Sequence, residues 1–196
     1  MIEAAIFDLD GTITVPVPDF HAIRSEIGVP DGADILSHIE TLSDAGQEKA
    51  HEILYRYEDE TARTNRLNVG TRELLDYLRK ENITTAVVTR NSRRSFTLCC
   101  ERHGLSFGSA VTREEAPPKP DPASVLILAE KLGFDPAKSI VVGDYLFDIQ
   151  LGEAVGAKTV LVKSDGVPRF EANPDYEVAS LAEIIPIVKK LGGSTE

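Results

Sequence analysis

The sequence is poor in cysteine and in long apolar stretches. Its 196 residues include two cysteines, one methionine and no tryptophan. The two cysteines, Cys99 and Cys100, are adjacent, and neighbouring cysteines rarely bridge each other, so we expect no disulfide framework. We predict that both pack as small apolar side chains on a helix. No stretch approaches the roughly 18 apolar residues of a membrane span, so no membrane partner is expected.

Positive charge is also scarce. Lysine and arginine number 21 against 32 aspartates and glutamates, which gives a formal net charge of −11. This balance argues against a nucleic-acid binder, which needs a basic face. A phosphate ligand stays compatible with it, because a few local cations or a metal can reverse the field inside one pocket. The first residues show no basic segment followed by an apolar run, so we expect no signal peptide and a cytoplasmic protein.

Short apolar runs alternate with helical patterns along most of the chain. The length suits one domain, or one domain with a small insertion. Strands are predicted over 4–7, 83–89, 139–142 and 158–162, with a weaker candidate over 109–112. We also expect a loop over 163–168 and a loose tail over 192–196. The alternation predicts an α/β fold with a doubly wound, mostly parallel sheet, which is a Rossmann-like core.

Residues 15–69 interrupt this alternation, because they contain no convincing strand. Helical patterns cover 19–27, 33–42 and 47–66. We therefore predict a small all-helical cap, inserted after the first strand into a core made of 1–14 and 70–196. The alternative is an ordinary helical subdomain without a role in the site.

Polar residues gather where the predicted strands end, and open parallel sheets bind ligands at that edge. The residues are Asp8, Asp10 and Thr12, then Thr89, Arg90 and Asn91, then Asp144 and Asp148, with Lys119 before a later helix. If the strands are neighbours, the carboxylates converge, and they cannot all stay ionised without a counter-ion. A hard cation with oxygen ligands solves this problem, so Mg²⁺ is the predicted cofactor.

Four separated elements, in this order, resemble the motifs of the haloacid dehalogenase-like hydrolase superfamily. They are Asp8-Leu9-Asp10-Gly11-Thr12, Thr89, Lys119 and Gly143-Asp144-Tyr145-Leu146-Phe147-Asp148. The chain looks like the phosphatase branch with a small helical cap after the first motif, as in phosphoglycolate phosphatase. The insertion is shorter than in such larger-capped relatives. The resemblance implies a Mg²⁺-dependent phosphatase that forms an aspartyl-phosphate and acts on a small phosphorylated metabolite. We expect a monomer or a weak dimer.

The resemblance also implies a role for each motif residue. Asp8 corresponds to the nucleophile, and Asp10 to the general acid and base, which the dehalogenase branch lacks. Thr89 and Lys119 complete the catalytic set. Phosphate binding falls to Gly11, Thr12, Thr89, Arg90, Asn91 and Lys119.

The metal ligands that the resemblance implies are Asp8, the backbone carbonyl of Asp10, and Asp144. Asp148 is expected either to hold these groups in place, which is the interpretation we prefer, or to bind the metal itself.

One departure from the family pattern is Arg90, which stands between Thr89 and Asn91, where many relatives have threonine followed directly by asparagine. With Arg93 and Arg94 it makes a basic cluster that either recruits an anionic substrate or is a solvated helix face. Two other functions stay open. One is a phosphomutase of the same superfamily, and the other is a non-catalytic binding module, against which the intact motif set argues.

Overall fold

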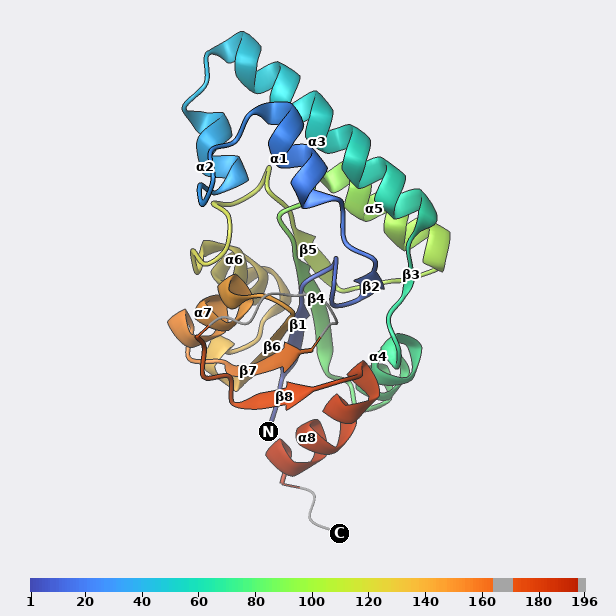
Figure 1. Ribbon diagram of the computed structural model, residues 1–196. Coiled ribbons are helices and arrows are strands. Elements are labelled where there is room, and N and C mark those ends of the chain that lie inside the picture. Colours follow the sequence, from blue (N-terminus) through green and yellow to red (C-terminus); the bar gives the residue numbers. More distant parts are fainter. Residues whose placement is uncertain (164–170, 194–196) are drawn as a thin grey trace.

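A parallel sheet of six strands forms the centre of the part of the chain that the structure describes (Figure 1). The computed structural model describes residues 1–163 and 171–193, so most of the predicted loop and the end of the predicted tail lie outside it. In spatial order the strands are β5 (Ser109–Val111), β4 (Thr84–Val88), β1 (Ala4–Phe7), β6 (Ser139–Gly143), β7 (Lys158–Val162) and β8 (Tyr176–Val178). The strand order departs from β1 in both directions, which confirms the predicted doubly wound sheet.

Helices cover both faces of the sheet, and successive side chains along a strand pack against opposite faces. Ala5 and Phe7 share one apolar cluster with the helices α4 (Thr71–Lys80), α5 (Arg93–His103) and α8 (Ile184–Leu191). Ala4 and Ile6 share the opposite cluster with α6 (Ala123–Leu132) and α7 (Leu146–Ala154). Every residue of β1 and β6 is buried, as expected of strands covered on both faces. Two 3-10 turns, η1 (Pro136–Lys138) and η2 (Leu181–Glu183), precede β6 and α8.

The insertion, residues 15–69, is called the cap below. It contains the helices α1 (Phe20–Ile27), α2 (Ile35–Glu40) and α3 (Asp44–Thr64), which enclose a small apolar core of their own. The expectation that this stretch holds no strand is wrong at its ends, where β2 (Thr14–Val15) pairs antiparallel with β3 (Arg66–Leu67). Two residues are too few to show a period of two, and the pairing arises because both ends of the insertion return to one place.

The long cap helix α3 lies beside the core helix α5 (Figure 1). Helix α5 begins after Ser92, whose hydroxyl accepts from Ser95 N, and it ends at Gly104 in the left-handed conformation. Cys99 is buried on α5 and Cys100 is half-buried, and both are free. Burial raises the pKa of Cys99 to about 11 and that of Cys100 to about 12, so both stay protonated at neutral pH. None of the described helices is long and apolar enough to cross a membrane.

Candidate active site

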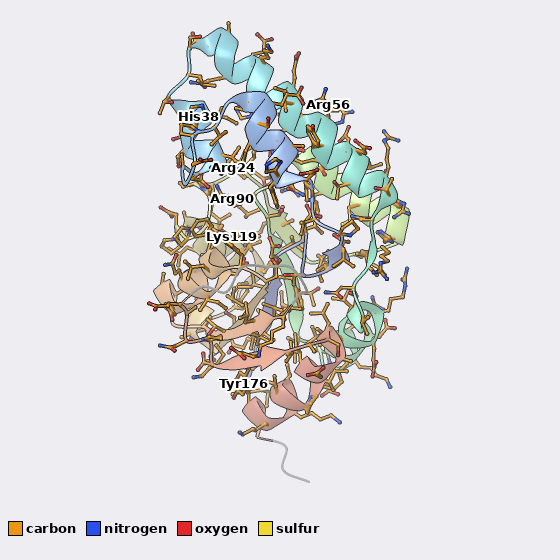
Figure 2. All side chains as sticks on the ribbon, viewed as in Figure 1. Arg24, His38, Arg56, Arg90, Lys119 and Tyr176 are labelled. Carbon is orange, nitrogen blue, oxygen red and sulfur yellow. The ribbon has the colours of Figure 1, made fainter. Side chains whose placement is uncertain are left out.

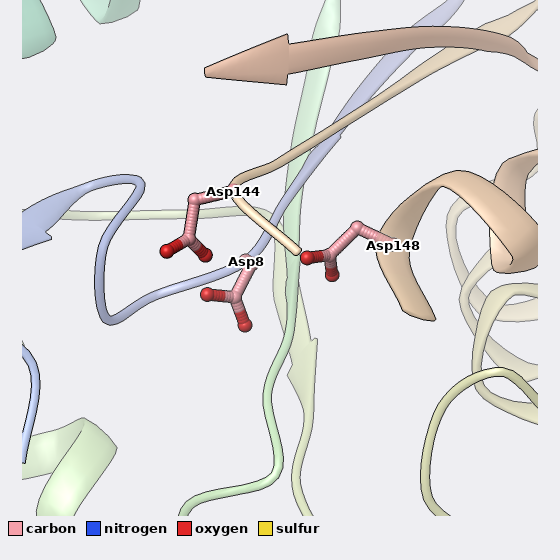
Figure 3. A group of neighbouring side chains, drawn as sticks. All are labelled: Asp8, Asp144 and Asp148. Carbon is pink, nitrogen blue, oxygen red and sulfur yellow. The ribbon is translucent and has the colours of Figure 1, made fainter. Parts of the chain in front are cut away.

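Three carboxylates meet at the carboxyl edge of the sheet (Figure 3). Asp8 follows β1, Asp144 follows β6, and Asp148 lies in the first turn of α7. Strands β1 and β6 are paired neighbours, so their last residues lie side by side. Each of the three aspartates offers an oxygen within 4.8 Å of the others. The topology therefore brings together the three carboxylates that the sequence placed after two different strands.

Lys119 joins this cluster from the loop that precedes α6. Its Nζ donates to Asp8 Oδ1 at 2.5 Å and to Asp148 Oδ1 at 2.6 Å. The Lys119 side chain is only 5% exposed, so these bonds lie away from bulk water. Asp148 accepts a second hydrogen bond, from Tyr145 N to Oδ2 at 3.1 Å. Both Asp148 oxygens are thus engaged, one of them in holding Lys119 beside Asp8.

Lys119 alone does not neutralise the three buried carboxylates of the cluster. Burial raises the pKa of Asp8 to about 7, with Lys119 opposing the rise and Asp148 adding to it. Burial, then the charges of Asp8 and Asp148, raise the pKa of Asp144 to about 8. Burial alone would lower the pKa of Lys119, but Asp148 and Asp8 raise it above its usual range. A metal ion would supply the missing charge, and an all-oxygen donor set of carboxylates fits a hard divalent cation such as Mg²⁺.

Two glycines allow the acidic side chains to approach the backbone. A Cβ at Gly11, where φ is +91°, would lie 2.1 Å from Asp144 Oδ2. A Cβ at Gly143 would lie 2.1 Å from Asp148 Cγ. Gly11 was predicted to serve phosphate binding, and its contact with the Asp144 carboxylate was not predicted. Gly143 was given no role, because its need appears only once α7 is placed.

Asp10 has different surroundings from the three clustered carboxylates. Its Oδ2 accepts from Asn91 Nδ2 at 2.5 Å, and its Oδ1 accepts from Thr14 Oγ1 at 3.0 Å. Burial raises the pKa of Asp10, although the hydrogen bonds from Asn91 and Thr14 oppose the rise. The structure thus gives the Asn91 amide a carboxylate partner, beside the phosphate role that the resemblance implied. Sequence reasoning missed Thr14, although its spacing from Asp10 fits a tight turn.

The two predicted threonines are both buried. Thr89 follows β4, and its Oγ1 accepts from Asn91 N at 3.1 Å. Within the described residues, the buried Oγ1 of Thr12 has no hydrogen-bond partner. A buried hydroxyl of this kind is able to donate to a ligand oxygen.

The three arginines of the basic cluster take separate partners. Arg90 Nη2 donates to Asp34 Oδ2 of the cap at 2.6 Å, and its guanidinium lies 5.2 Å from the Phe147 ring centre. The other two side chains pair with Glu115 (Arg93) and Asp59 (Arg94). Figure 2 shows Arg90 where the cap meets the core, near Lys119. Arg90 and Arg94 therefore both link the core to the cap, and local sequence gave no signal for the pairing of Arg90 with Asp34, 56 residues away.

Comparison with known proteins places the chain in a family. The family model for haloacid dehalogenase-like hydrolases matches residues 5–162. A haloacid dehalogenase-like hydrolase domain-containing protein of Arabidopsis thaliana is 34% identical over 201 residues, which cover 93% of this chain and 82% of the relative. The chain belongs to the haloacid dehalogenase-like hydrolase family, as the motifs predicted.

Other similar proteins have more specific names. An N-acetylmuramic acid 6-phosphate phosphatase of Pseudomonas putida is 30% identical, with 89% of this chain and 88% of that protein covered. A phosphoglycolate phosphatase of the same organism is 27% identical over 92% of this chain and 78% of its own. Among solved structures, a hydrolase of this superfamily from Geobacter sulfurreducens has a TM-score of 0.68 at 25% identity, covering 95% of this chain and all of that one.

Proposed function

We propose that the protein is a Mg²⁺-dependent phosphatase that hydrolyses a small phosphorylated metabolite through an aspartyl-phosphate on Asp8. The observation that carries this proposal is the Asp8 carboxylate, held by Lys119 at 2.5 Å within a cluster of three aspartates at the sheet edge. A second buried aspartate, Asp10, lies two residues away with its carboxylate separately hydrogen-bonded. Relatives named as phosphatases for small phosphorylated compounds support the substrate class.

The proposed reaction has two displacements at phosphorus. In the first, an Asp8 oxygen forms a bond to phosphorus while the bond to the leaving oxygen breaks, and Asp10 gives that oxygen a proton. In the second, Asp10 takes a proton from water, whose oxygen attacks phosphorus and releases Asp8. Lys119 stabilises the negative charge on Asp8 and on the transferring group in both steps.

The residues proposed to hold Mg²⁺ are Asp8, Asp144 and the backbone carbonyl of Asp10. When bound, the ion would neutralise the converging carboxylates and draw negative charge from the transferring phosphoryl group. Asp148 is proposed to act by holding Lys119 in place, because both of its oxygens are already engaged by Lys119 and Tyr145 N.

Phosphate oxygens are proposed to bind at the turn after β1 and at the end of β4. Gly11 would let the backbone approach the phosphate oxygens closely. The same oxygens would bind the hydroxyls of Thr12 and Thr89 and the ammonium group of Lys119. Arg90 and Asn91 are proposed to serve the same site less directly, since one pairs with the cap and the other with Asp10. The cap, residues 15–69, is proposed to choose the leaving group.

One assay tests the proposal. Hydrolysis of 4-nitrophenyl phosphate should depend on Mg²⁺ and stop with EDTA. A screen of phosphorylated metabolites, beginning with phosphoglycolate and N-acetylmuramic acid 6-phosphate, should then find a preferred substrate. Complete absence of turnover would favour a binding module, and turnover that requires a bisphosphate would favour a phosphomutase.

A further inference from the structure

A buried glutamate of the cap contacts the core beside the candidate active site. Glu58, on α3, is 4% exposed. Its Oε2 accepts from Ser92 N at 3.1 Å and from Ser92 Oγ at 2.9 Å. Its Oε1 accepts from Arg113 Nη1 in an ion pair whose side chains are 5% and 6% exposed. Because Ser92 caps α5, Glu58 fixes the start of that helix from outside the core.

Arg113 extends the same network along the backbone towards Asn91. Its Nη1 also donates to the carbonyl oxygen of Arg90 at 3.2 Å, and its own backbone N donates to the carbonyl oxygen of Asn91 at 3.2 Å. The guanidinium lies 5.0 Å from the ring centre of Tyr55, which is one helical turn before Glu58 on α3. Glu58 and Arg113 together therefore hold the peptide groups on both sides of Asn91.

Asn91 is the residue whose side chain reaches Asp10. Its Nδ2 lies 2.5 Å from Asp10 Oδ2, and its backbone N donates to Thr89 Oγ1. The Asn91 side chain can fix the Asp10 carboxylate only if the Asn91 backbone is itself fixed. The backbone from Arg90 to Ser92 is fixed by Glu58 and by Arg113, which is the ion-pair partner of Glu58. The contacts thus run unbroken from a cap helix to the carboxylate of Asp10.

A second ion pair, one residue along α3, also joins the cap to the core and shows what is unusual about Glu58. Asp59, the next residue on α3, pairs at 2.5 Å with Arg94 on α5, whose side chain is 68% exposed. Among the described residues, that pair joins α3 to α5 and makes no hydrogen bond or ion pair with Ser92, Arg113 or Asn91. A fully buried ion pair adds little stability relative to apolar packing, because both charges lose their hydration. The hydrogen bonds of Glu58 and Arg113 instead fix the position of the backbone from Arg90 to Ser92, which carries Asn91.

We propose that Glu58 is a positioning residue for the reaction, which acts through Ser92, Arg113 and Asn91 to hold Asp10 where it can protonate the leaving group. The inference rests on the proposed function, in which Asp10 is that proton donor. If Glu58 has this role, the cap helps to position the proton donor as well as to select the substrate.

The test compares two aryl phosphates of nearly the same shape. Phenolate is a poor leaving group that needs a proton, whereas 4-nitrophenolate leaves readily without one. The ratio kcat/KM is the proper measure, because it reports only the steps up to the first irreversible one, which is transfer of the phosphoryl group to Asp8. Glu58→Gln should lower kcat/KM for phenyl phosphate about tenfold, and for 4-nitrophenyl phosphate less than about threefold.

The matched control is Asp59→Asn, which removes the neighbouring ion pair between α3 and α5 and leaves the contacts of Glu58 in place. It should change kcat/KM for both substrates equally and by less than about twofold. In an Asn91→Ala background, which should itself show the selective loss, Glu58→Gln should have no further selective effect.

If Glu58→Gln does not fold, Arg113→Lys replaces it. That variant keeps the buried charge beside Glu58 but loses the planar fork that also reaches the Arg90 carbonyl. Equal losses for both substrates in the folded variant, or no loss, would overturn the inference and make Glu58 a purely structural residue. Failure of the proposed function would look different, because the wild-type protein would then hydrolyse neither substrate.

Discussion

Arg90 Nη2 lies 2.6 Å from Asp34 Oδ2, and this pair joins the core, one residue after Thr89, to the residue that caps the cap helix α2. Asp34 Oδ1 accepts from Ser37 N at 3.0 Å, so the carboxylate is anchored in the cap by one oxygen and turned to the core by the other. The guanidinium is held from another side by the Phe147 ring. The pair therefore ties the start of the cap helix α2 to the core next to the candidate site.

The first prediction concerns this pair. Asp34→Asn keeps an oxygen for Ser37 N but removes the charge that faces Arg90. The pair is partly exposed, so its loss should change KM for the preferred metabolite by about two- to fivefold. Steady-state kinetics should show kcat for 4-nitrophenyl phosphate nearly unchanged, because a small aryl group needs little from the cap. An equal change in kcat for both substrates would place Asp34 in the chemistry itself.

The second prediction concerns the nucleophile. Asp8→Asn keeps the size of the side chain but removes the negative charge of the attacking oxygen and one of the two carboxylates that pair with Lys119. Turnover should fall at least about 10³-fold, because covalent catalysis and a metal ligand are lost together. Circular dichroism should show the same secondary structure as the wild type. Near-normal hydrolysis by a folded Asp8→Asn protein would refute the assignment.

The third prediction concerns pH and metal. Burial raises the pKa of Asp8 to about 7 and that of Asp144 to about 8, whereas both would titrate near about 4 in the unfolded chain. A carboxyl group with a raised pKa in the folded state binds more protons there, so its stabilising contribution is present at low pH. This contribution is lost as the pH rises from about 4 to about 8. Without metal, the melting temperature should therefore fall over that range.

Mg²⁺ should reverse this loss, because it binds the ionised carboxylates of the folded state. Thermal melts with and without Mg²⁺ should show a gain of at least about 3 °C near pH 8 and a smaller gain near pH 5. The control is Asp144→Asn, in which the gain should shrink. A gain that is equal at both pH values would contradict the proposed ligands.

The fourth prediction separates the two aspartates that follow β6. Asp144→Asn should weaken Mg²⁺ binding at least about tenfold, because it removes a proposed ligand. Asp148→Ala should weaken it far less but lower kcat, because Lys119 loses the partner at 2.6 Å that holds it beside Asp8. Calorimetric titration with Mg²⁺ and steady-state kinetics measure the two effects. Stronger loss of Mg²⁺ binding in Asp148→Ala would make Asp148 the ligand instead.

Much of the site could be predicted because residues that follow the strands of a parallel sheet lie at one edge of that sheet. Asp8 follows one buried apolar strand and Asp144 follows another, and the carboxyl ends of neighbouring parallel strands share one edge. The alternation of strand and helix predicted such a sheet. The meeting of these side chains was then predicted on the condition that the strands are neighbours, which β1 and β6 fulfil. Gly11 was predicted only as a phosphate-binding residue of the turn after the first strand, whereas the Asp144 carboxylate that excludes a Cβ there was placed by the fold.

Three of the four shortest strands were not predicted from local patterns. Strands β2 and β3 have two residues each, and β8 has three, so none of them shows a period. They form because the rest of the chain brings their backbones into reach of a partner.

Tertiary structure alone decided how the cap meets the core. Arg90 pairs with Asp34 from 56 residues away, and Arg113 pairs with Glu58 from 55 residues away. Which charged side chain meets which depends on how far the cap helices are rotated and shifted against the core. The apolar periodicity of a helix specifies its buried face but not its register against a neighbour. The sequence by itself therefore determined the sheet edge where the motif aspartates meet, whereas packing decided which cap residues hold Asn91 and Arg90 beside it.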